Sequence, residues 1–183
     1  MALSKIDAAN FLNGTIPSGN ISTASLAAAA TGKVLQVVQT IKTDTFSSST
    51  ASSFTDITGM NATITPSATS SKILILGNIN TDSGNNSHIR LLRGSTPICV
   101  GDSSSSRSQV TGAGSRNSGS GVDMANNGIS FLDSPSSTSS LTYKFQFYLW
   151  NSQNWYLNRS NDDADAGYAG RSASTITLME IGT

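Results

Sequence analysis

The most constraining feature of this sequence is a run of ten residues, LTYKFQFYLW, at positions 141–150. Large side chains alternate there with smaller or more polar ones, so that one row faces a core and the other a mixed surface. The core row is Leu141, Tyr143, Phe145, Phe147 and Leu149, and the surface row is Thr142, Lys144, Gln146, Tyr148 and Trp150. A period of two residues is typical of a β-strand, and it predicts a fold built from sheets.

Eight further short segments read as strands, because apolar and β-branched residues stand between connections rich in Gly, Ser and Asn. They are residues 34–41, 62–65, 72–79, 88–93, 98–100, 129–132, 155–158 and 174–181. Gly94 and Pro97 lie between two of these segments and predict a hairpin. Many short strands without intervening helical periodicity predict an all-β, antiparallel two-sheet sandwich of jelly-roll type.

Hydroxyl residues dominate the polar composition, with 33 Ser and 20 Thr among 183 residues. Their side chains compete for helical backbone groups and so argue against long helices. Only 12% of residues are charged, and 11 basic side chains balance 11 acidic ones. A net charge of zero without charge runs disfavours nucleic acid and anionic membrane as partners. No window approaches the roughly 18 apolar residues of a membrane span, and the first thirty residues lack a secretory signal pattern.

Residues 1–32 differ from the rest of the chain. Turn formers come first, and an alanine-rich stretch at residues 24–30 follows, which favours one short helix at residues 22–30. Alanine offers too little apolar bulk for a separate core, so this segment either docks onto another protein or stays mobile. We therefore expect an extended or short-helical attachment segment at residues 1–32 before a β module at residues 33–183. Its candidate anchor residues are Ile6, Phe11, Leu12 and Ile16.

The chain ends on a strongly strand-like segment, STITLMEI, at residues 174–181. Both faces of this strand carry apolar atoms, which is typical of a strand buried on two sides. One side would belong to its own sandwich and the other to a neighbouring subunit, and a homotrimer would order the chain end by burying it. The candidate interface residues are Ile176, Leu178, Met179 and Ile181.

Motifs for catalysis are weak, and we expect no enzyme, no cofactor and no metal. His88 is the only histidine and Glu180 the only glutamate, so neither a histidine metal site nor a pair of catalytic glutamates is available within one chain. Asp162, Asp163 and Asp165 form an acidic cluster with the oxygen ligands that Ca²⁺ prefers. The cluster lacks the spacing of an EF-hand, so a solvated turn is the favoured interpretation, and calcium binding stays open.

Two other features bear on binding. Trp150, Trp155 and Tyr156 gather late in the chain, where an aromatic platform would stack on a host-surface glycan, although packing is the commoner use of such residues. Residues 101–127 form the longest stretch without a strand signal, beyond the roughly 12–15 residues usual for a structureless loop. This stretch is either a functional surface loop or partly disordered.

Three stretches carry a resemblance: GKVLQVVQ at 32–39, ITPSATSSKILI at 64–75 and RSASTITLMEI at 171–181. Together they resemble virion structural proteins of marine tailed bacteriophages, especially those that infect cyanobacteria. The resemblance covers about residues 32–183 and implies a trimeric β-rich appendage of the virion, assembled in the host cytoplasm, without catalysis. It also implies that a variable N-terminal segment contacts capsid or tail proteins and that the β module resembles the distal domain of a fibre.

The leading hypothesis is therefore a short fibre or decoration protein of a phage particle, with a compact knob because the chain has no repeat shaft. Capsid decoration and tail adhesion to a host are not separable from the sequence. The alternative, from another class, is a stand-alone carbohydrate-binding module of lectin type. It draws on the tryptophans and the acidic cluster.

Overall fold

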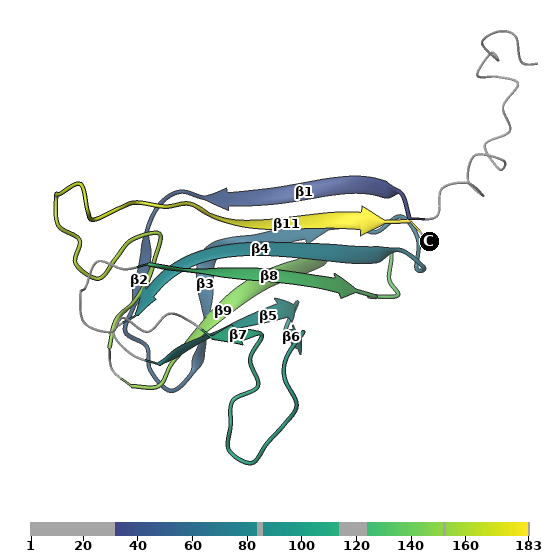
Figure 1. The fold of residues 1–183 in the computed structure, drawn as a ribbon. Helices are drawn as coiled ribbons and strands as arrows, with labels where there is room; N and C mark the ends of the chain where they lie inside the picture. Colours follow the sequence, from purple (N-terminus) through teal and green to yellow (C-terminus); the bar gives the residue numbers. More distant parts are fainter. Residues whose placement is uncertain (1–31, 84–85, 114–123, 152, 183) are drawn as a thin grey trace, which may run out of the picture.

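The computed structural model describes residues 32–83, 86–113, 124–151 and 153–182 (Figure 1). In these residues there are eleven β-strands and no helix, which confirms the all-β class. The strands are β1 (Val34–Lys42), β2 (Phe46–Ser48), β3 (Phe54–Ile64), β4 (Lys72–Ser83), β5 (Ser87–Arg93), β6 (Thr96–Ile98), β7 (Gly112–Ala113), β8 (Ala125–Asp133), β9 (Leu141–Leu149), β10 (Trp155–Leu157) and β11 (Ser174–Ile181). The helix expected at residues 22–30 lies outside the described residues.

The strands form two antiparallel sheets. Sheet A has the order β1-β11-β4-β10-β2, with β8 on the other side of β4, and sheet B has the order β3-β9-β5-β6, with β7 also paired to β5. β4 is long enough to pair with β11 along its first part and with β10 at its end. Figure 1 shows the long strands of sheet A, β1, β11, β4 and β8, running side by side as one layer.

The core lies between the two sheets and follows from the alternation in β9. Tyr143, Phe145, Phe147 and Leu149 are fully buried, whereas the side chains between them face the other side of sheet B. Sheet A supplies isoleucines and leucines from β4 and β11, including Ile73, Ile75, Ile79, Ile176 and Leu178. The surface row predicted for β9 therefore forms part of the outer face of sheet B.

The last strand, β11, lies between β1 and β4 within one chain. Two backbone hydrogen bonds close this end of the sheet, from the Gly32 N–H to the Gly182 carbonyl at 2.6 Å and from the Gly182 N–H to the Lys33 carbonyl at 2.9 Å. The expectation that assembly is what orders the chain end is therefore corrected, because the strand is held by both neighbours in its own sheet.

The hairpin predicted around Gly94 is confirmed, but its second strand is Thr96–Ile98 and not the predicted 98–100. Arg93 pairs with Thr96 across the turn, and Gly94 adopts a positive φ of 60°. Pro97 lies in β6, at the edge of sheet B, where no further strand needs its missing N–H group. The loop that follows β6 forms one wall of the site described next.

Candidate functional site

A hollow on the outer face of sheet B is the best-formed candidate site. Its first wall comes from β9 and β5, where Tyr148 and His88 are directly paired residues. Their rings stack with centroids 6.0 Å apart and an interplanar angle of 18°. Trp150 follows β9 on the same face, and its side chain is 66% exposed. The alternation in β9 thus places a tyrosine and a tryptophan together on the outside of the sheet.

The opposite wall is the loop between β6 and β7. Four hydrogen bonds fix its shape: Gly101 N–H to the Val110 carbonyl at 3.2 Å, Gln109 Nε2 to the Gly101 carbonyl at 2.8 Å, and two from Arg107 to Ser104. Those two run from the Arg107 N–H to the Ser104 carbonyl at 3.0 Å and from Nη1 to Oγ at 2.9 Å. The first part of the long strand-free stretch is therefore a surface loop with a defined shape.

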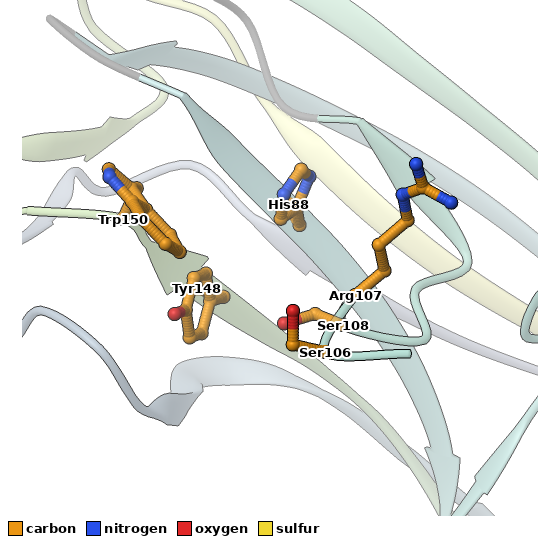
Figure 2. Close-up of a pocket in the computed structure, with 6 residues that line it drawn as sticks. All are labelled: His88, Ser106, Arg107, Ser108, Tyr148 and Trp150. Carbon is orange, nitrogen blue, oxygen red and sulfur yellow. The ribbon is translucent and has the colours of Figure 1, made fainter. Parts of the chain in front are cut away.

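The space between these walls has a volume of about 380 Å³, which falls within the roughly 300–1,000 Å³ typical of ligand pockets. It is lined by His88, Ser106, Arg107, Ser108, Tyr148 and Trp150. Figure 2 shows Tyr148 and Trp150 on one side, the loop residues on the other and His88 between them. The lining combines aromatic faces, hydroxyl groups and one guanidinium, and it contains no carboxylate.

A network of charged and polar side chains lies next to the hollow, and its members bind one another. Asp56 accepts hydrogen bonds from Lys144 Nζ at 2.6 Å and from Gln146 Nε2 at 2.7 Å. Gln146 in turn accepts one from Arg90 Nη2 at 2.7 Å, and the Arg90 guanidinium lies 3.5 Å from the centroid of the Phe54 ring. These groups brace sheet B and are not available to a ligand without breaking existing contacts.

His88 is set apart from an ordinary surface imidazole by partial burial. Desolvation lowers its pKa from the usual 6.5, so the ring is neutral at pH 7. Its Nδ1 atom is buried and has no hydrogen-bond partner among the described residues. The floor of the hollow is therefore an uncharged ring system, and Arg107 carries the hollow's positive charge.

A second candidate surface is the outer face of sheet A. The register places Val37, Met179, Leu74 and Leu132 in one row across β1, β11, β4 and β8. The large apolar residues on this side of the sheet are here named the apolar face. They are Val34, Val37, Ile41, Leu74, Leu76, Leu132, Met179 and Ile181. Val37 is 55% exposed, Ile41 57% and Leu132 47%. Contiguous exposure of this kind is typical of an interaction surface.

The four interface residues predicted in β11 do not share one surface. Ile176 and Leu178 are fully buried between the sheets, because alternate residues of a strand point to opposite faces. Met179 and Ile181 lie on the apolar face and are half-buried. The face also includes residues of β1, β4 and β8 that were not predicted from the sequence.

The predicted aromatic set is likewise divided. Trp155 is fully buried and stacks on Phe147 with centroids 4.8 Å apart. Tyr156 is 6% exposed and lies under the Arg159 guanidinium, 4.0 Å from the ring centroid. Trp150 is exposed and lines the hollow. Tyr148 and His88 join it there because of strand pairing, and Arg107 joins it because of the loop, for which the sequence carried no specific signal.

One member of the acidic cluster, Asp163, is engaged by arginines. Asp163 forms ion pairs with Arg171 and, at 3.5 Å, with Arg159. Hydrogen bonding from Arg171 lowers the pKa of Asp163 below its usual 3.8. Within the described part of the chain, no three His, Cys, Asp or Glu side chains gather as metal ligands would. The geometry here is that of a charged turn closed by ion pairs.

The anchor candidates Ile6, Phe11, Leu12 and Ile16 lie outside the described residues. The described residues include no helix with the length and apolarity needed to cross a bilayer. A comparison of the sequence with protein-family models and with curated proteins finds no match.

Proposed function

We propose that this chain is a non-enzymatic structural subunit of a bacteriophage particle. In this proposal the sandwich has a jelly-roll-like arrangement, three copies assemble through the apolar face, and the trimer projects from the virion as a short fibre or decoration. Residues 1–32 attach it to capsid or tail proteins, and assembly takes place in the host cytoplasm. The resemblance of three stretches to phage virion proteins supplies the setting, and the apolar face supplies the physical support.

The single observation that carries the proposal is the row of large apolar side chains across four strands of sheet A. A fully buried side chain of this kind contributes about 1.5–3 kcal/mol, so covering a half-exposed one contributes roughly 1 kcal/mol. Five residues of the apolar face are exposed to this extent, namely Val34, Val37, Ile41, Leu76 and Leu132. Covering them therefore favours association by several kcal/mol before the cost of association. Lys72, which pairs with Ile181, is the one charged residue in the register rows of this face.

The virion role is tested by incorporation into particles. Phage particles are assembled in cells that supply either the full-length chain or a version lacking residues 2–31, and purified particles are probed for the protein. We expect the full-length chain on particles and the shortened one in the unbound fraction. Particles that carry the shortened version at the full level would contradict attachment by the N-terminal segment.

A second experiment separates decoration from adhesion. Purified full-length protein is incubated with capsids that lack it and, separately, with host cells. A decoration protein binds the capsids and ignores the cells, whereas a tail adhesin binds the cells. Failure to bind either would contradict the virion proposal.

A second candidate function, a stand-alone lectin-like module, is favoured by one specific observation. Trp150 is 66% exposed at the rim of a hollow lined with hydroxyl groups, and exposed aromatic faces of this kind suit the apolar face of a sugar ring. This alternative expects glycan binding by the isolated protein and no affinity for phage particles. The same hollow would serve host attachment if the protein is an adhesin.

A further inference from the structure

Trp150 is held in place by its backbone while its ring stays open to solvent. Its N–H donates to the Asn86 carbonyl at 3.2 Å, and its own carbonyl accepts from Ser52 Oγ at 3.4 Å. The ring itself is 66% exposed and forms one side of the hollow. Because the backbone is held and a tryptophan side chain has only two rotatable angles, little conformational entropy is lost when a ligand stacks on the ring.

Arg107 carries the charge of the hollow, and its guanidinium forms no ion pair with the described residues. Its backbone and Nη1 are tied to Ser104, but no carboxylate in the described part of the chain lies within ion-pair distance of it. Arg90, the nearest arginine on β5, is instead engaged with Gln146 and Phe54. Arg107 thus offers its remaining N–H donors to a ligand, in a fork that fits a carboxylate.

The other lining groups restrict the chemistry of that ligand. Ser106 and Ser108 supply hydroxyl groups on the loop side, which pair with the hydroxyl groups of a sugar as donor or acceptor. One guanidinium in a chain of net charge zero is too little to bind a polyphosphate backbone, which requires several cations along its length. A ligand that matches this lining has one anionic group for Arg107, a ring with an apolar face for Trp150 and several hydroxyls for the serines.

We infer that the hollow on sheet B binds an acidic sugar residue, with its ring stacked on Trp150 and its carboxylate on Arg107. The inference rests on the glycan-binding role proposed above for the hollow, and it adds the chemical class of the sugar. It is independent of assembly through the apolar face, which lies on the other sheet.

The test uses the full-length chain and calorimetric titration with two matched pairs of probes. Trigalacturonic acid is compared with its methyl ester, and 3′-sialyllactose with its methyl ester, so that each pair differs chiefly in the charge of the carboxylate. We expect at least one acidic probe to bind about tenfold or more tightly than its neutral counterpart. The Arg107→Gln variant should reduce that ratio to about twofold or less, and Trp150→Ala should weaken both members of the pair by about tenfold.

Two matched variants control for general effects. Lys33→Gln removes an exposed cation and Tyr168→Ala an exposed aromatic ring, both from residues outside the lining, and both should bind as the unaltered protein does. A thermal melt of each variant confirms that it folds. Equal affinity for acid and ester would overturn the inference while leaving glycan binding intact. The absence of binding to all four probes at millimolar concentration would overturn both, and neither result bears on the oligomeric state.

Discussion

Glu180 keeps its negative charge in an enclosed position near the end of β11. It is 1% exposed, and its carboxylate accepts hydrogen bonds from Ser67 N–H at 2.7 Å, from Ser67 Oγ at 2.6 Å and from Gln36 Nε2 at 2.6 Å. Desolvation alone would raise its pKa, but the hydrogen bonds from Ser67 and Gln36 outweigh it and lower the pKa from 4.5 to about 2. The carboxylate therefore ties the connection before β4 to the closing strand.

This arrangement predicts acid sensitivity. Because the folded pKa lies below the unfolded value, the stabilisation is present above about pH 4.5 and is lost as pH falls through about 2. The lowering of the pKa from 4.5 to about 2 corresponds to a contribution of about 3 kcal/mol from this enclosed group. Denaturant unfolding between pH 6 and pH 2 measures it, and Glu180→Gln should remove that part of the pH dependence. An unchanged pH profile in the variant would contradict the assignment.

Gly77 of β4 faces the core and lies against the Phe145 ring of the opposite sheet. A Cβ added there would lie 2.6 Å from Phe145 Cζ and 3.1 Å from Cε2. Gly77→Ala should therefore destabilise the protein by about 1–3 kcal/mol through overpacking. Gly101→Ala is the matched control, because nothing lies within 4 Å of its added Cβ. Equal unfolding midpoints for the two variants would show that the core yields at this point.

At the scale of elements, one buried amide joins three parts of sheet A. Asn158 follows β10 with a φ of 63°, and its Nδ2 donates to the Lys42 and Asp44 carbonyls at 2.8 and 2.9 Å. Its Oδ1 accepts from Ser174 Oγ at 2.6 Å. The amide thus links the turn after β1, the end of β10 and the start of β11.

Removing this amide is expected to be costly. Asn158→Ala leaves the carbonyls and the Ser174 hydroxyl without their buried partner and should reduce the free energy of unfolding by about 2–4 kcal/mol. Asn126→Ala removes an exposed amide from β8 and should change it by less than about 0.5 kcal/mol. Chemical denaturation of both variants gives the comparison. If Asn158→Ala lowers the free energy of unfolding no more than the control does, the stabilising role of this amide is refuted.

Most strands were predictable because their apolar residues alternate or cluster between turn formers. Residues 174–181 match β11 in full, and 72–79 and 88–93 match most of β4 and β5. β2 and β7 were missed because they are only three and two residues long and are defined by their partners. The first part of β3 was missed because Asp56 and Gly59 interrupt the apolar pattern, where the pairing with β9 shifts register.

The site was less predictable than the fold. The alternation in β9 placed Tyr148 beside Trp150, so half of the aromatic wall was readable from the sequence. His88 lies in the hollow because β5 pairs with β9, and Arg107 lies there because hydrogen bonds shape its loop. Local sequence patterns do not predict such contacts. Trp155 was selected as an exposed aromatic and is a core residue, because an aromatic ring suits either place.

At the scale of the whole molecule, the two sheets offer different outer surfaces. Sheet A exposes a nearly uncharged apolar face, and sheet B exposes a braced polar network with a hollow at its side. We propose that sheet A serves assembly and sheet B serves ligand binding. Assembly through sheet A is the more directly measurable of the two.

The measurement that tests it is the solution mass of the full-length chain by light scattering, beside a variant with Leu132→Glu and a control with Thr63→Glu. Leu132 lies on the apolar face, and Thr63 is an exposed residue of β3 on sheet B. We predict about 57 kDa, three times the 19.0 kDa of one chain, for the full-length protein and the control, and a folded species near 19.0 kDa for Leu132→Glu. A folded full-length monomer, or a Leu132→Glu variant that stays trimeric, would contradict assembly through this face.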